Sequence, residues 1–235
     1  MKKLIVNADD FGYTPRINQG VIAAFKNGVV TSASIIPTRD GLDDAVALAK
    51  ENPKLSVGVH VDLDEMFTVD HGTGRVSGVK GTFNRDAVET EVARQIEMLL
   101  SRDIRPDHLS SHHHVHMVRD VFHVVVPLMI KYGIPVMRFH RRIAVEPEAY
   151  DEMKVFLDAQ GIISLPHFIE GWYWGNIDEV FDCAELMTHP GYGELWREYE
   201  LLASCDSKLK SYLREKDIRL ITFAELIAET RSQSA

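Results

Sequence analysis

The sequence predicts an α/β fold: an irregular or incomplete (β/α) barrel of about seven parallel strands, with a doubly wound open sheet as the alternative. Two observations carry this prediction. Short apolar segments typical of strands alternate with amphipathic segments typical of helices along almost the whole chain. Acidic, histidine and arginine residues come immediately after several of the strand segments, and the ends of the strands are where both architectures form their sites.

Each expected strand is a short apolar run, and the run at residues 55–61 is apolar enough to be covered on both faces, as in a parallel sheet. Parallel strands require crossover connections, and the segments between these runs are long enough to be helices. In order, the expected strands cover residues 4–6, 32–37, 55–61, 107–111, 134–139, 162–165, 184–189 and 218–222.

The connecting segments carry apolar residues three or four positions apart, the pattern of helices that pack on a sheet. Thr14 and Asn84 are expected N-caps, Pro15 suits a first turn, and Thr222 with Glu225 forms a capping box. In order, the expected helices cover residues 15–27, 43–52, 84–99, 118–132, 148–159, 195–215 and the stretch after 222, before a frayed tail.

Two stretches break this alternation. Residues 62–84 are polar, acidic and contain glycine, which predicts a binding loop or lid, its charges either solvated or recognising a cationic substrate or product. A second loop carries Trp172, Tyr173 and Trp174, whose flat faces suit sugar rings, with core packing and a dimer interface as alternatives.

Composition narrows the class of protein. A chain of 235 residues with 45% hydrophobic content fits one domain covering residues 1–235. A formal net charge of −9 argues against nucleic acid or an anionic membrane as the main partner. The two cysteines, Cys183 and Cys205, are expected to be reduced, and no apolar stretch is long enough for a signal sequence or membrane span, so we expect a cytoplasmic protein.

Acids, imidazoles and one arginine follow successive expected strands, so they should meet at one rim of the barrel. A hydrolytic metal site needs about three protein ligands and an open position for water, whose pKa the metal lowers. One carboxylate and two imidazoles would serve, with the neighbouring carboxylate as general base and a further His protonating the leaving group. The rim residues are Asp9, Asp10, His60, His112 to His116, Arg138 and His189.

Four histidines occupy five positions at the end of the fourth expected strand, namely His112, His113, His114 and His116. On a strand, His112, His114 and His116 would share a side; on a helix, His112 and His116 would lie one turn apart. Either geometry lets at most three of them converge on one metal.

Several motifs together carry a family resemblance. The chain resembles the YdjC-like carbohydrate deacetylases, the chitooligosaccharide deacetylase group. This resemblance implies an irregular barrel related to polysaccharide deacetylases, a divalent metal ion, and removal of acetyl groups from N-acetylated amino sugars or short oligosaccharides. The motifs are Asn7-Ala8-Asp9-Asp10-Phe11-Gly12, Asn18-Gln19-Gly20, Gly58-Val59-His60, Ser111-His112-His113-His114-Val115-His116 and His189-Pro190-Gly191.

The resemblance also implies roles for individual residues. Asp10, His60 and His112 would bind the metal, with His116 as a competing ligand, and Asp9 would be the base. His189 would protonate the departing amine, and Arg138 would orient Asp9. His113 and His114 would support the ligands or line the cleft, and His114, Trp172 and Trp174 are the candidates for substrate contact.

One position departs from the family pattern: members usually have an aspartate where this chain has Ser110, so its reaction or substrate could differ. Two alternative functions therefore stay open, a metal-dependent phosphoesterase and a non-catalytic metal- or sugar-binding regulatory protein. The ligand set suits several divalent metals, with Mg²⁺ and Zn²⁺ preferred. The expected partner is an N-acetylated sugar, and the fold is compatible with a homodimer.

Overall fold

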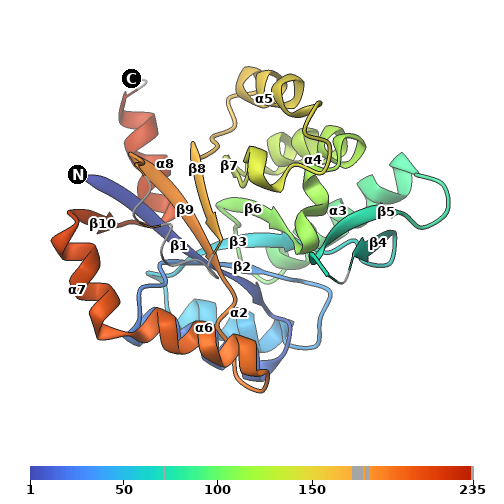
Figure 1. Ribbon diagram of the computed structural model, residues 1–235. Helices are drawn as coiled ribbons and strands as arrows, with labels where there is room; N and C mark the ends of the chain where they lie inside the picture. The colour runs from blue at the N-terminus through green and yellow to red at the C-terminus, as the bar shows by residue number, and fades with distance from the viewer. Residues whose placement is uncertain (71, 171–176, 178–179, 234–235) are drawn as a thin grey trace.

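The computed structural model describes residues 1–70, 72–170, 177 and 180–233, and contains one curled, wholly parallel sheet (Figure 1). Seven strands follow the order β7-β6-β3-β2-β1-β9-β8, and β10 pairs with the N-terminal end of β1, beside β2. The strands are β1 (Lys2–Phe11), β2 (Ser32–Ile35), β3 (Ser56–Val61), β6 (His108–Ser111), β7 (Val136–Met137), β8 (His167–Glu170), β9 (Cys183–Thr188) and β10 (Ile218–Leu220).

Helices cover the outer face of this sheet in two groups, α6, α1 and α2 on one side and α3, α4 and α5 on the other (Figure 1). Their apolar faces and the outward side chains of the strands form the main hydrophobic core. The helices are α1 (Pro15–Asn27), α2 (Leu42–Glu51), α3 (Arg85–Leu100), α4 (Arg119–Tyr132), α5 (Tyr150–Ala159), α6 (Leu195–Cys205), α7 (Ser207–Glu215) and α8 (Phe223–Gln233).

The curled sheet encloses a small interior and comes close to closing. Val136 of β7 makes a single parallel bridge with Ile163, in the segment that leads into β8. A second, smaller apolar cluster fills the end of the interior nearest the strands' N-termini, and Phe223 at the start of α8 belongs to it. This confirms the expected incomplete barrel and not the open sheet.

Some element boundaries differ from the sequence prediction. The expected strand at residues 162–165 was wrong: only Ile163 bridges, Leu165 packs in the interior cluster, and the strand, β8, begins after Pro166. Proline lacks a donor for the ladder, so pairing resumes beyond it. The expected helix at 195–215 is two helices, because Asp206 ends α6 and caps α7.

The polar stretch expected as a loop, residues 62–84, contains an antiparallel hairpin of β4 (Phe67–Asp70) and β5 (Arg75–Val79). Its inward residues Phe67 and Val76 are buried against the main core. Two apolar anchors are too few to be recognised as strands by alternation in the sequence.

Among the described residues, no helix is both long and apolar enough to cross a membrane. Trp172, Tyr173 and Trp174 lie outside the described residues.

Candidate active site

The candidate site lies at the carboxyl ends of the strands, where the sequence placed it. Asp9 and Asp10 are near the end of β1, and His60 is the penultimate residue of β3. His112, Arg138 and His189 each follow directly after their strands, β6, β7 and β9. All of them are therefore brought to one rim of the half-barrel by the parallel topology alone.

Adjacent aspartates on a regular strand would point to opposite faces of the sheet. Here the β1–β2 register shifts between Ala8 and Phe11, and Asp10 has φ of 62°, a left-handed conformation that aspartate tolerates better than most residues. This irregularity lets the buried side chains of Asp9 and Asp10 both reach the site.

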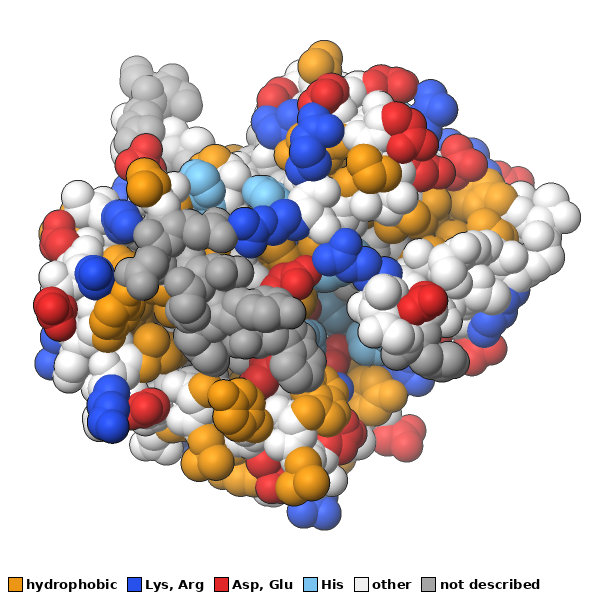
Figure 2. All heavy atoms as spheres, viewed as in Figure 1, with side chains coloured by type: hydrophobic (Ala, Val, Ile, Leu, Met, Phe, Trp, Pro, Cys, Tyr) orange, Lys and Arg blue, Asp and Glu red, His pale blue; other side chains and the backbone are white. Residues whose placement is uncertain are grey.

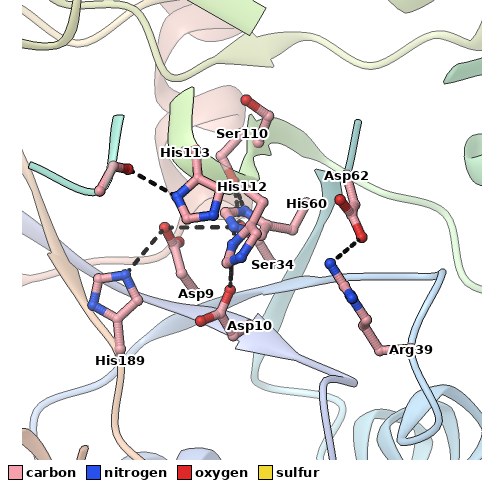
Figure 3. Close-up of polar contacts among 12 residues, drawn as sticks. Asp9, Asp10, Ser34, Arg39, His60, Asp62, Ser110, His112, His113 and His189 are labelled. Carbon is pink, nitrogen blue, oxygen red and sulfur yellow. Dashed lines mark hydrogen bonds and ion pairs between the residues drawn. The ribbon is translucent and has the colours of Figure 1, made fainter. Parts of the chain in front are cut away.

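Asp10, His60 and His112 form a compact grouping, whose ligand atoms all lie within 4.8 Å of one another. Asp10 Oδ1 is 3.4 Å from His60 Nε2 and 3.1 Å from His112 Nδ1, and both rings point at this carboxylate in Figure 3. Among the described residues, no hydrogen bond satisfies the buried Asp10 Oδ1. A buried anionic oxygen that faces two imidazole nitrogens fits a divalent metal ion, which would satisfy all three atoms.

The charges around Asp10 keep it ionised. Burial by itself would raise the pKa of Asp10, but His112, His60 and Arg197 outweigh burial and hold it well below its usual value. Arg197 Nη2 donates to Asp10 Oδ2 at 2.7 Å, leaving Oδ1 for the imidazoles. The pKa of His112 shifts in the opposite direction: burial lowers it, but Asp10, together with Asp64 and Asp62, outweighs burial and raises it.

Asp9 belongs to a buried triad of charges. Arg138 Nη1 and Nη2 donate to the two Asp9 oxygens at 2.6 and 2.7 Å, and the same guanidinium donates to Glu185 Oε1 at 2.8 and 2.6 Å. Asn7 Nδ2 donates to Asp9 Oδ1 at 2.8 Å. Burial favours protonated Asp9, but Arg138, together with His60 and His189, outweighs burial, so the pKa of Asp9 lies far below its ordinary value.

His189 faces the site from the loop after β9. Its Nε2 lies 4.0 Å from Asp9 Oδ2, and its Nδ1 lies 3.5 Å from Glu200 Oε2. Burial lowers the pKa of His189, but Glu200, Asp10 and Asp9 together raise it above its ordinary value. Glu200 also accepts hydrogen bonds from Thr188 Oγ1 and the His189 backbone N–H, so it holds the loop as well as the ring.

Close backbone packing fixes this loop. A Cβ atom added to Gly20 in α1 would lie 2.4 Å from the Gly191 Cα. Only a glycine therefore lets α1 approach the His189-Pro190-Gly191 segment so closely.

The histidine cluster follows neither of the two patterns considered from the sequence. Residues 112–117 form short 3₁₀ turns, interrupted where His113 and His114 take left-handed φ values of 54° and 57°. The reversal directs His112 into the site and His116 away from it. His116 Nε2 contacts the Arg138 carbonyl at 2.7 Å and its Nδ1 contacts Ser111 Oγ, so both ring nitrogens are occupied. Burial lowers the pKa of His116 to about 3, which keeps it neutral.

The other two histidines border the site. His113 Nδ1 bonds the Gly74 carbonyl at 2.8 Å and so joins the cluster to the β4–β5 hairpin. With Asp64 and His112, His113 makes a second, more exposed grouping of metal-ligand type. His114 is buried and lines the same cavity as the site, and burial together with the Arg138 charge holds its pKa well below normal.

A cavity of about 700 Å³ opens above these residues, and Figure 2 shows the hollow with histidine side chains at its floor. Its size is that of a small-molecule site. The aromatic side chains among its lining are Tyr13 and Trp196, and the hairpin contributes Arg75, which pairs with Glu170 at 2.8 Å.

Sequence reasoning missed four residues here, Glu185, Trp196, Arg197 and Glu200. Arg197 and Glu200 lie three positions apart on α6, the helix that follows His189, so helical spacing alone places them on one face. Met187 of β9 lines the cavity. Side chains two residues apart on a strand share a face, so this alternation could have identified Glu185 as a neighbour of the site.

The fold is of the polysaccharide deacetylase type. Peptidoglycan deacetylase from Bacillus subtilis superposes with a TM-score of 0.52 at 10% identity, covering 100% of this chain and 94% of the other, a likeness of fold alone. The chain itself belongs to the YdjC-like protein family, which its residues 3–223 match.

Two relatives match almost from end to end. A carbohydrate deacetylase from Clostridium beijerinckii is 32% identical over 249 residues, covering 95% of this chain and 100% of the relative. The crystal structure of a candidate cellobiose-phosphate cleavage protein from Enterococcus faecalis V583 has a TM-score of 0.76 at 26% identity, covering 96% and 98% of the two chains.

Proposed function

We propose that this protein is a metal-dependent hydrolase that removes acetyl groups from N-acetylated amino sugars or short oligosaccharides. The observation that carries the proposal is the buried Asp10 Oδ1, which faces His60 Nε2 and His112 Nδ1 with Asp9 and His189 beside it. The carbohydrate deacetylase named among the relatives supports the same chemistry.

Asp10, His60 and His112 would hold the metal ion. When bound, a divalent ion such as Zn²⁺ or Mg²⁺ acidifies water and polarises a carbonyl oxygen. His116 is a weaker candidate as ligand than the sequence suggested, because hydrogen bonds occupy both of its ring nitrogens.

Asp9 would act as the general base, taking a proton from the water that attacks the acetamide carbonyl. It is unprotonated at neutral pH, as a base must be, since Arg138 lowers its pKa. The same Arg138 contact makes Asp9 a weak base, so proton transfer to it requires a water more acidic than bulk water. Arg138 also fixes the direction of the carboxylate, because both Asp9 oxygens are held at once.

His189 would act as the general acid that protonates the departing nitrogen. Glu200 is the closest negative charge to its Nδ1, and the raised pKa of His189 increases the protonated fraction near neutrality. Asp9 and His189 thus differ in protonation state at one pH, the condition for paired base and acid roles.

The sugar would lie in the cavity above the site. Tyr13 and Trp196 offer aromatic faces there, and His114 lines the wall. Trp172 and Trp174 remain candidates for the same contact.

Acetate release from acetylated chitooligosaccharides tests the function directly. We expect release by the metal-loaded protein, its loss on chelation and its return with added Zn²⁺ or Mg²⁺. Asp9→Asn should abolish turnover and leave metal affinity unchanged within about twofold, because Asp9 is not a ligand. Absence of acetate release from every N-acetyl sugar tried, with metal bound, would refute the proposal.

The same protein preparation should be assayed with a chromogenic phosphate ester, which tests the phosphoesterase alternative. Phosphate release with no acetate release would favour the phosphoesterase alternative. Metal and sugar binding that survives Asp9→Asn, with no turnover in either form, would instead indicate a binding protein.

A further inference from the structure

A continuous chain of hydrogen bonds, buried except at its last link, leads from His60 through the barrel interior to Asp107 near the opposite end. His60 Nδ1 lies 2.8 Å from Ser110 Oγ, and Ser110 Oγ lies 2.9 Å from Ser34 Oγ. Ser34 Oγ lies 3.0 Å from His108 Nε2, and His108 Nδ1 lies 2.6 Å from Asp107 Oδ1. Figure 3 shows the beginning of this chain at Ser34, Ser110 and His60.

Strand register and a glycine make room for this chain of hydrogen bonds. His60 and Ser110 are directly paired in the β3–β6 register, and Ser34 is paired with Gly58 across β2 and β3. A Cβ on Gly58 would come within 2.4 Å of His108 Nε2, so the bare glycine is what admits the His108 ring. The other face of that ring stacks on Phe223 with centroids 3.9 Å apart.

The chain can run in two directions, and Asp107 decides between them. If His60 carries its proton on Nδ1, it donates to Ser110, Ser110 to Ser34 and Ser34 to His108 Nε2, so that the His108 Nδ1–H donates to Asp107. In the reverse direction, neutral His108 would turn a bare Nδ1 lone pair toward the carboxylate at 2.6 Å, which is repulsive. Asn7 also donates to Ser34 at 2.9 Å, and Ser34 can accept that bond in either direction.

We propose that Asp107, His108, Ser34 and Ser110 are positioning residues that favour the His60 tautomer with its proton on Nδ1, so that Nε2 is free to bind the metal ion beside Asp10. The proposal rests on His60 being a metal ligand, as inferred above. A metal ligand's second nitrogen commonly donates to a carboxylate that lies next to it. Here the carboxylate acts from across the barrel, and Ser110 suits this role because a hydroxyl accepts one hydrogen bond and donates another.

The two serines of β2 provide a matched test. Ser32 and Ser34 are both fully buried on the same strand, but Ser32 Oγ has no hydrogen-bond partner among the described residues. Ser34→Ala breaks the chain in the middle and frees the Ser110 hydroxyl to donate to His60 instead. Ser32→Ala removes a hydroxyl of equal burial outside the chain. Asp107→Asn keeps the shape but removes the charge that sets the direction.

Nitrogen-15 NMR of the metal-free protein at about pH 8, where most imidazoles are neutral, reports the His60 tautomer directly. In the metal-free protein Asp10 Oδ1, 3.4 Å from His60 Nε2, favours the opposite tautomer, so we expect a mixture in which the Nδ1–H form of His60 is clearly populated in the unaltered protein and in Ser32→Ala. Ser34→Ala and Asp107→Asn should shift this mixture toward the Nε2–H form. Titration calorimetry with Zn²⁺ should then show affinity about tenfold weaker in these two variants, the lower end for outer contacts of a metal ligand, and unchanged in Ser32→Ala.

Two results would overturn the proposal: a His60 protonated exclusively on Nε2 in the unaltered protein, or an unchanged ratio of tautomers in both Ser34→Ala and Asp107→Asn. Asp107→Asn keeps the proposal testable if Ser34→Ala fails to fold. Because the NMR measurement needs neither metal nor substrate, its failure is distinct from a failure of the unaltered protein to bind metal or release acetate.

Discussion

Replacing Arg138 with methionine should destabilise the protein strongly at neutral pH. The change keeps a long side chain but removes the buried charge that makes four hydrogen bonds to Asp9 and Glu185. Summed as charge-assisted bonds these would be worth roughly 6–12 kcal/mol, but desolvation of the three charges offsets much of that. Removing one partner of a buried ion pair costs about 3–5 kcal/mol, and this is the loss we expect.

The pH dependence of this loss follows from Asp9. In the unaltered protein the folded-state pKa of Asp9 is below its unfolded value, so its contribution to stability is present above the unfolded pKa and lost as pH falls through the folded one. Without Arg138, burial dominates and should raise the folded-state pKa of Asp9 above the unfolded value. Protonation of Asp9 then removes the unpaired buried charge in the variant, so the loss of stability relative to the unaltered protein should become smaller toward acid pH.

Urea and thermal unfolding of the metal-free proteins, at about pH 7.5 and about pH 5, measure both effects. A loss of about 4 kcal/mol corresponds to a melting temperature lower by roughly 8–16 °C in a chain of this size. A deficit below about 1 kcal/mol at the higher pH, or one that grows toward the lower pH, would refute the reasoning.

Three further predictions concern the rim and the interior. Asp10→Asn keeps a residue that tolerates the left-handed backbone, and calorimetry should show Zn²⁺ affinity reduced at least about tenfold; undiminished affinity would remove Asp10 from the ligand set. Glu200→Gln lowers the pKa of His189, so the alkaline limb of the rate profile should move to lower pH, and an unmoved limb would contradict the acid role. Gly58→Ala forces a methyl group against the His108 ring and should cost about 1–3 kcal/mol in urea unfolding; a neutral change would show that the ring can shift freely.

The sequence by itself determined the class of fold and most of the rim. Alternating apolar segments with helical connections imply parallel strands, and parallel strands place Asp10, His60 and His112 at one end whatever the details of the loops. The motifs spread from β1 to β9 were enough to indicate the family, which the match over residues 3–223 confirms.

Tertiary structure decided which neighbours act on those residues. The bulge in β1 that turns Asp9 and Asp10 to the same site, and the left-handed pair that separates His112 from His116, arise from backbone irregularities that side-chain periodicity does not report. The β4–β5 hairpin was likewise hidden, since its buried contacts are few and distant in sequence.

The same limit applies to the electrostatics. The family resemblance implied that Arg138 orients Asp9, but the second carboxylate that Arg138 contacts, Glu185, could not be found in this way. Glu185 meets Arg138, and Glu200 meets His189, only when the helices and strands pack. Electrostatic effects depend on distance and burial. Sequence spacing specifies neither for residues far apart in the chain, so the ligand types could be read from the sequence, whereas their protonation states required the fold.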